Sequence, residues 1–158
     1  MADSYRHKAN FQLKRGRAGA TVLECAFVLP IVLVVLFALL DLGIAAVRYN
    51  ALADASRRIA REAIIHGSLA PAETGTWGPA QFVGTASDGS QVVSSVQRVL
   101  PTMATSEVSV RVSWPDGDNS PRDRVEVEMT YQHEPLIPAL FAWGTLDLRS
   151  TTTMRIVN

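Results

Sequence analysis

The hydrophobic pattern divides the chain into an apolar run, a helical stretch with two unlike faces and an alternating C-terminal region. Ala20 to Leu40 is apolar apart from Thr21 and Glu24. A helix of about twenty residues, rising 1.5 Å per residue, matches the roughly 30 Å hydrocarbon core of a bilayer. The run therefore predicts a transmembrane helix over residues 20–40.

Helical periodicity continues beyond the run, over residues 41–66. Charged side chains gather on one side of this extension, where Asp54 precedes Arg58 by four residues and predicts an ion pair. Gly67 and then Pro71 supply the stop signal. The opposite side carries an apolar stripe at helical spacing, made of Ile44, Val47, Ala51, Ala55, Ile59 and Ala63.

Residues 67–104 read as a loop followed by one short helix. Ser68 to Ser90 is rich in Gly, Pro, Ala, Ser and Thr and has no strong period, which is typical of a loop. Gln91 to Leu100 places its valines on one side and is followed by Pro101, so a short amphipathic helix is expected there.

Strict alternation of apolar and polar residues predicts strands in the last region, residues 105–158. Two strands are expected at Glu107–Trp114 and Arg124–Gln132, and a third at Thr145–Ile156. The turn-rich stretch Pro115–Pro121 joins the first two, and its composition predicts a mobile loop. The sequence thus predicts a membrane-anchored α+β chain: a long N-terminal helix, comprising a span and its amphipathic extension, then a small antiparallel sheet with a short helix.

Charge asymmetry predicts the orientation of the span. Residues 1–19 form a basic leader in which Asp3 is the lone acid, whereas Asp41 directly follows the apolar run. The positive-inside rule places this leader in the cytoplasm and the C-terminal region outside it. The basic residues of the leader are Arg6, Lys8, Lys14, Arg15 and Arg17.

Three other interpretations of the apolar run fit the sequence less well. A secretory signal peptide would be cut near Ala45, but the run exceeds the usual 7 to 15 residues of such a core. A lipoprotein signal would have its apolar segment before Cys25, whereas here most of the segment follows it. A buried helix of a soluble domain fits the length and uniformity of the run less well than a span does.

Candidate catalytic and metal-binding groups are scarce. Cys25 is the single cysteine, and His7, His66 and His133 share no ligand spacing, so each histidine is expected on the solvated surface. The stretch Asp116–Asn119 lacks the downstream glutamate of a calcium loop and reads as a turn. With a formal net charge of zero, nothing indicates nucleic-acid binding. We expect no enzyme activity, no metal, no cofactor and no small-molecule substrate.

Glu24 is the costly residue of the apolar run. A carboxylate at the centre of a bilayer costs about 2 to 3 kcal/mol, so intramembrane acids usually have a partner. Glu24 lies near the start of the helix, however, and its side chain can also extend to the headgroups. From this residue alone the two interpretations are equally good.

The stretch Arg15 to Glu24 resembles the processing site of type IV pilin-like proteins, whose basic leader ends in glycine and whose fifth mature residue is glutamate. By this resemblance a prepilin peptidase cuts after Gly19, and Ala20 becomes the first residue. The new ammonium at Ala20 offers Glu24 a charge partner, in the same helix or on a neighbouring subunit. A glycine before the cut also costs little when the backbone extends into a peptidase.

The resemblance extends to the TadE family of minor pilins from tight-adherence pilus systems. It rests on Gly19 to Pro30 and its continuation through Phe37, on Asp41-Leu42-Gly43, and on Ala60-Arg61-Glu62-Ala63. The C-terminal pattern is also similar: Val125-Glu126-Val127, Tyr131, Pro135-Leu136, Leu140, Leu146 and Ser150 to Arg155. Cys25 departs from the small or apolar residue expected at its position, although a buried cysteine behaves as a small hydrophobe.

The resemblance implies a single-pass inner-membrane minor pilin or pseudopilin that takes part in assembling a tight-adherence, Flp-type pilus. Its implied partners are the prepilin peptidase and other pilin and pilus-assembly subunits. Pro30 removes one helical hydrogen bond and is expected either to kink the helix or to be tolerated within it. The alternative is an anchored extracytoplasmic binding module that keeps residues 1–19 and never enters a pilus. A more distant alternative, an anchored hydrolase, would need a convergent catalytic group that this sequence does not show.

Overall fold

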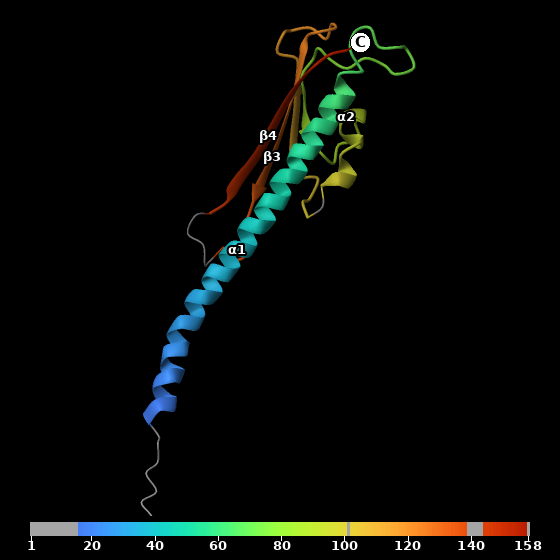
Figure 1. Ribbon diagram of the computed structural model, residues 1–158. Helices are drawn as coiled ribbons and strands as arrows, with labels where there is room; N and C mark the ends of the chain where they lie inside the picture. Colours follow the sequence, from blue (N-terminus) through green and yellow to red (C-terminus); the bar gives the residue numbers. More distant parts are fainter. Residues whose placement is uncertain (1–15, 101, 139–143, 158) are drawn as a thin grey trace, which may run out of the picture. The chain divides into compact units, whose positions relative to one another are not determined.

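A long helix and a four-stranded antiparallel sheet dominate the fold (Figure 1). The computed structural model describes residues 16–100, 102–138 and 144–157. The α+β class and the long N-terminal apolar helix predicted from the sequence are confirmed. The elements in chain order are α1 (Gly16–Ala63), β1 (Phe82–Thr85), α2 (Gln91–Ser94), the 3-10 helix η1 (Gln97–Val99), β2 (Ser109–Ser113), β3 (Arg124–His133) and β4 (Leu146–Arg155).

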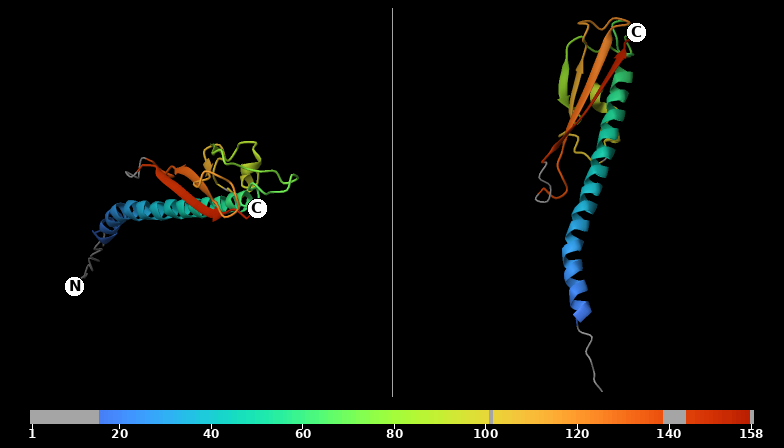
Figure 2. Two further views of the ribbon diagram at one scale, coloured as in Figure 1. Left: turned by 90° about the horizontal axis from the view of Figure 1, so that it is seen from above. Right: turned by 60° about the vertical axis from the view of Figure 1, so that its left-hand side comes forward.

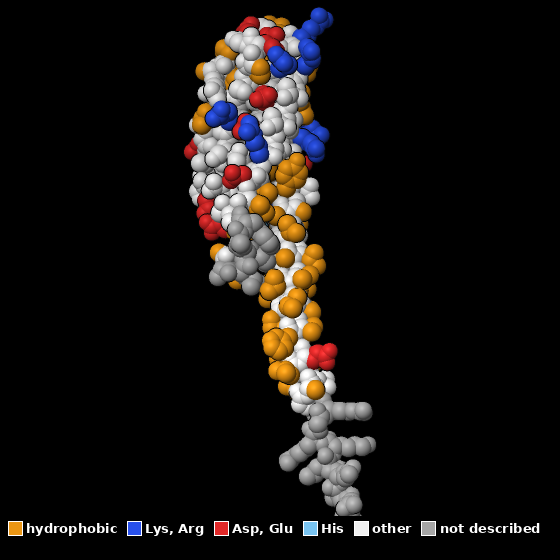
Figure 3. All heavy atoms as spheres, turned by 90° about the vertical axis from the view of Figure 1, so that its left-hand side faces the viewer, with side chains coloured by type: hydrophobic (Ala, Val, Ile, Leu, Met, Phe, Trp, Pro, Cys, Tyr) orange, Lys and Arg blue, Asp and Glu red, His pale blue; other side chains and the backbone are white. Residues whose placement is uncertain are grey.

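The chain divides into two units within α1, Met1–Phe37 and Ala38–Asn158. In the first unit, the large apolar side chains of α1 are exposed, with Phe27 69% and Ile31 66% accessible. Hydrophobic side chains accordingly cover this helical segment on the face shown in Figure 3. Among the described residues, Gly19–Ala63 is the helix long and apolar enough to cross a membrane. Pro30 lies inside α1 without ending it.

In the second unit, α1 lies along one face of the sheet (Figure 2). The strands are ordered β1-β2-β3-β4, and each pairs with its neighbour in antiparallel register. The strand positions predicted from alternation are confirmed to within two residues at each end for β2, β3 and β4. The core joins two sets of residues: Leu52, Ala55, Ile59, Ala60 and Ala63 from α1, and Val110, Val112, Val125, Val127 and Met129 from the sheet.

Small residues let α1 approach the sheet closely. Besides its alanines, α1 presents Ser56, which is fully buried. The Ser56 hydroxyl lies 2.8 Å from that of Thr152 and 3.2 Å from that of Ser150, both on β4. These hydroxyls satisfy one another where water is excluded, so the contact fixes the position of α1 along β4.

The apolar stripe predicted on α1 is only half correct. Ala55, Ile59 and Ala63 are buried, but Val47 is 55% exposed and Ile44 is half-buried. Steps of four residues advance about 40° beyond a full turn, so a stripe with that spacing drifts around the helix. The buried face instead follows mixed steps of three and four residues, through the buried Asp41, Ala45 and Leu52 and the half-buried Arg48. The predicted Asp54–Arg58 ion pair is confirmed at 2.9 Å.

The region after α1 holds more structure than its composition predicts. The expected loop Ser68–Ser90 contains β1, which has only four residues and includes Gly84, too short for a detectable alternation. The expected helix Gln91–Leu100 is divided into α2 and η1, and Pro101 lies outside the described residues. Helix α1 ends at Ala63, three residues before the predicted boundary, and tighter turns follow.

The loop that joins β2 to β3 is anchored in its middle. Asn119 is 6% exposed, and its side-chain amide donates to the Trp77 carbonyl over 2.9 Å. The Asn119 carbonyl accepts from the Ser68 amide, also at 2.9 Å. These bonds restrain a stretch, Pro115–Pro121, that the sequence predicted to be mobile.

Gly78 makes room for a buried tryptophan. Its φ of +81° favours glycine, and a Cβ placed there would collide with the ring of Trp114, which is 7% exposed. Gly75 has nearly the same φ, +77°, but open space around it. Both glycines therefore have a backbone conformation that favours glycine, but only Gly78 lacks the space for a side chain.

We predict that Gly78→Ala destabilises the domain more than Gly75→Ala. Both variants bear the cost of a left-handed backbone, about 1 kcal/mol. Gly78→Ala adds the cost of overpacking against Trp114, roughly 1 to 3 kcal/mol. Thermal unfolding of the two variants measures the difference, and equal losses would show that the Gly78–Trp114 contact adds nothing.

Candidate functional site

The predicted processing residues lie at the start of the described helix. Gly19, Ala20 and Glu24 all belong to α1 and are exposed. One helical turn separates Ala20 from Glu24, so an ammonium at Ala20 and the Glu24 carboxylate would lie on the same side. A Cβ added at Gly19 would meet nothing within 4 Å, so the fold itself does not require glycine there. Any need for glycine at this position has to come from another molecule.

A buried polar cluster, which the sequence analysis missed, joins α1 to the end of β3. It consists of Asp41 and Arg48 from α1 and His133 from β3; Asp41 and His133 are 0% and 1% exposed. His133 Nε2 lies 3.3 Å from Asp41 Oδ1, and Arg48 Nη1 lies 2.6 Å from His133 Nδ1. The imidazole therefore stands between a carboxylate and a guanidinium.

The chemistry of arginine fixes the protonation of His133. A guanidinium has donors and no acceptor, so Arg48 donates to Nδ1, which must be unprotonated. The neutral ring then carries its proton on Nε2, the nitrogen facing Asp41. The Nε2–Oδ1 contact lacks hydrogen-bond alignment, so here the attraction is electrostatic. A neutral imidazole thus links a positive and a negative side chain.

The same carboxylate holds the chain that leaves β3. The backbone amide of Leu136 donates to Asp41 Oδ1 over 3.0 Å, across 95 residues of sequence. Asp41 therefore contacts both the last residue of β3 and the segment beyond it. Because this segment begins the connection to β4, the cluster fixes where the longest hairpin of the sheet meets α1.

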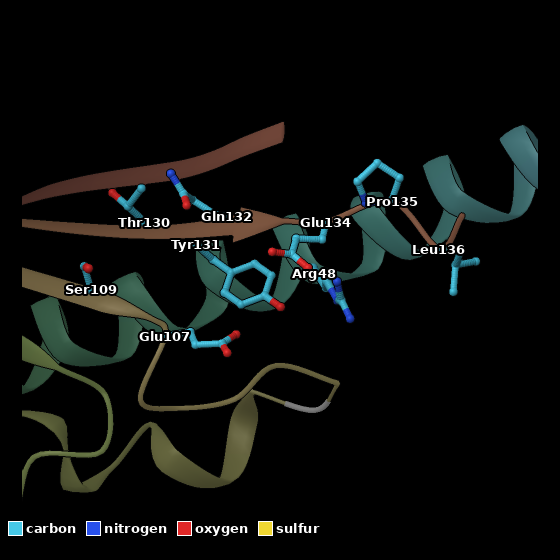
Figure 4. A pocket seen from close by; sticks show the side chains of 9 residues that line it. All are labelled: Arg48, Glu107, Ser109, Thr130, Tyr131, Gln132, Glu134, Pro135 and Leu136. Carbon is cyan, nitrogen blue, oxygen red and sulfur yellow. The ribbon is translucent and has the colours of Figure 1, made fainter. Parts of the chain in front are cut away.

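A surface cavity of about 760 Å³ opens beside this cluster (Figure 4). Arg48 forms part of its wall, with its guanidinium carbon 5.3 Å from the centre of the Tyr131 ring, a cation–π distance. Glu107 and Glu134 line it from the loop before β2 and the segment after β3. The wall mixes both charges with hydroxyl and amide groups, and no nucleophile paired with a base is among its residues.

Two of the three histidines contradict the surface prediction. His133 is buried in the cluster, and His66 is 9% exposed. The His66 ring stacks on Trp77 with centroids 4.0 Å apart, and its Nδ1 donates to the Glu62 carbonyl at 2.7 Å. Both rings replace solvent contacts with protein contacts, so the two residues stabilise the fold. His7 lies outside the described residues.

The acidic turn after β2 is held by internal partners. Side-chain and backbone hydrogen bonds from Arg124 lower the pKa of Asp116 to about 2. Hydrogen bonds from the Ser120 hydroxyl and the Asn119 amide lower the pKa of Asp118. Within the described residues no group of three or more His, Cys, Asp or Glu side chains is placed to hold a metal ion.

The N-terminal part of the chain is similar to a known protein family. Residues 19–61 match the family model of TadE-like protein. The resemblance found in the sequence is confirmed over this segment, which holds Gly19, Ala20, Glu24 and Pro30 as well as Asp41 and Arg48. A TadE-like segment indicates a role connected with the Tad pilus. Searches of curated proteins and of solved structures gave no match.

Two patterns in the sequence are consistent with the cluster of Asp41, Arg48 and His133, although the sequence analysis did not predict it. Alternation along β3 places His133 on the same face as Tyr131, two residues earlier. In the TadE-like segment, Asp41, Ala45, Arg48 and Leu52 have helical spacing, but two of the four are charged. Apolar periodicity does not include charged residues, so the burial of Asp41 becomes evident only when α1 and β3 are placed together.

We predict that Asp41→Ala destabilises the domain far more than Asp54→Ala. Removing Asp41 leaves the Leu136 amide without its acceptor and the buried His133 without its carboxylate partner, at a cost of about 3 kcal/mol. Asp54 pairs with Arg58 on the same helix, but both side chains are half exposed, so its loss costs less than about 1 kcal/mol. Equal midpoints in thermal unfolding would contradict a stabilising role for the cluster.

Proposed function

We propose that the chain is a TadE-like minor pilin or pseudopilin that takes part in assembling a tight-adherence pilus. The observation that carries the proposal is the family match over residues 19–61, which begins at the glycine where the leader is expected to end. The exposed apolar surface of α1 in this segment supports a membrane anchor. A prepilin peptidase and other pilus subunits are then its partners.

The apolar half of α1 has two successive roles in this proposal. Before assembly it anchors the chain in the inner membrane, with residues 1–19 in the cytoplasm and the sheet on the other side. During assembly the same side chains pack against the helices of other subunits. The exposure of these apolar side chains in the described chain supports both roles, because lipid or other helices can then contact them.

The proposed role is structural and not enzymatic. The buried polar contacts between α1 and the sheet support a structural role: Asp41 and His133 join α1 to β3, and Ser56 joins α1 to β4. Binding to lipid and to other subunits needs no cofactor and no small-molecule substrate. Assembly therefore depends on surfaces, above all on the matched segment of α1.

We predict that Gly19→Val blocks removal of the leader. A branched side chain before the cut would hinder an extended backbone in the peptidase, whereas Gly19 has open space in the fold. The precursor should stay about nineteen residues longer on a gel, in a host with an active prepilin peptidase. Gly16→Val is the matched control and should be processed normally. If instead Gly16→Val blocked processing and Gly19→Val did not, the cleavage site would lie after Gly16.

We predict that Glu24→Gln is processed but associates weakly with other pilus subunits. The amide has the shape of the carboxylate without its charge, so the ammonium created at Ala20 loses its partner in a low-dielectric setting. Cross-linking in membranes measures the association. Glu24→Asp keeps the charge and should retain most of the association. Equal cross-linking of the unmodified protein and both variants would show that the charge of Glu24 does not contribute to assembly.

A further inference from the structure

An apolar surface remains open on α1 just beyond the predicted span. A groove of about 400 Å³ runs along Leu39, Leu40, Gly43, Ile44 and Val47, and Thr102 lies at its side. Val47 is 55% and Leu40 51% exposed. Ile44 and Val47 are the members of the predicted stripe that lie in this groove.

The segment that follows β3 adds a further exposed apolar side chain, which lies near the beginning of the domain part of α1. Leu136 is 54% exposed, and its amide is bonded to Asp41, the residue next to Leu40. Leu136 is therefore fixed at the point of the chain where the apolar run ends. We call Leu39, Leu40, Ile44, Val47 and Leu136 the collar.

Burial of Asp41 removes the charge that would keep the collar in water. Between Glu24 and Arg48, Asp41 is the only Asp, Glu, Lys or Arg. Since its side chain is fully buried against His133 and Leu136, the exposed surface of α1 carries no charged side chain from Cys25 to Val47. The uncharged surface is thus longer than the run read from the sequence.

The length of this surface matches a bilayer with its headgroup layers. From Ala20 to Val47, α1 rises roughly 42 Å, because each residue adds about 1.5 Å. A bilayer measures about 30 Å across its hydrocarbon core and 40 to 45 Å with its interfacial layers. Residues beyond Leu40 therefore fall in an interfacial layer. Tyr49, 47% exposed, lies two residues beyond Val47, and tyrosine is enriched at such interfaces.

We propose that the collar lies in the outer headgroup layer of the membrane, so that the domain rests on the lipid surface. A lipid surface suits the collar better than a second copy of the chain does. The collar continues along α1 from the exposed apolar segment that the proposed function places in lipid. Burial of Asp41 is then the feature that lets the domain approach the bilayer. The inference rests on the membrane anchorage proposed above.

Spin-label depth measurements test the proposal. In a Cys25→Ser background, the full chain carries a label at Leu136→Cys, Leu33→Cys or Val83→Cys and is reconstituted in phosphatidylcholine vesicles. Val83, 66% exposed on β1, is the aqueous reference, and Leu33 lies within the predicted span. Frequent collisions of the label with oxygen indicate that it lies in lipid, and frequent collisions with a water-soluble nickel chelate indicate that it lies in water. The label at Leu136 should collide with nickel on the order of threefold less often than that at Val83, as expected for an apolar group 5–10 Å into the interface.

Each outcome distinguishes the collar from the anchor. Equal nickel collisions at Leu136 and Val83, with the Leu33 label in lipid, would overturn the collar and leave the anchor intact. An aqueous label at Leu33 would overturn the anchor and with it the proposed function. Shielding of Leu136 from both reagents, with magnetic coupling between copies, would show a protein contact and also overturn the proposal. Val47→Cys repeats the comparison on α1 should the Leu136 label disturb the domain.

Discussion

The buried carboxylate of Asp41 is the constraint on which the arrangement of the domain depends. It lies one residue beyond the predicted span, on the face of α1 that packs against the sheet. An isolated buried charge is costly, so it requires polar partners. His133 supplies one at the end of β3 and the Leu136 amide supplies another. The last residue of β3 and the segment after it are thereby tied to the first turns of α1 in the domain.

Beyond the contacts of Asp41, the interface between α1 and the sheet contains few large side chains. Leu52 and Ile59 fill the core, while the alanines and Ser56 keep the backbones close. At the other end of the domain, His66 stacks on Trp77, and Asn119 binds the Trp77 carbonyl. Polar contacts thus join α1 to the sheet at Asp41, the loops after α1, before β1 and after β2 are joined at the other end, and an apolar core lies between.

The sequence predicted what local periodicity encodes: the long helix, three of the four strands, and the Asp54–Arg58 pair. It did not predict β1, whose four residues form a strand because β2 lies beside them. Nor did it predict the burial of Asp41 and His133, because each depends on a partner about ninety residues away. The predicted processing residue Gly19 and the predicted charge partner Glu24 are a different case. Their proposed role concerns a peptidase and other subunits, so their evidence comes from the resemblance and the match over residues 19–61.

The central claim is that this chain is a TadE-like pilin and not a permanently anchored binding module, and the two differ at the first residue of the mature protein. Sequencing the N-terminus of the unmodified protein, extracted from membranes of a host with an active prepilin peptidase, tests the claim most directly. The account predicts a sequence beginning Ala20-Thr21-Val22. A sequence beginning at Met1 or Ala2 would contradict it.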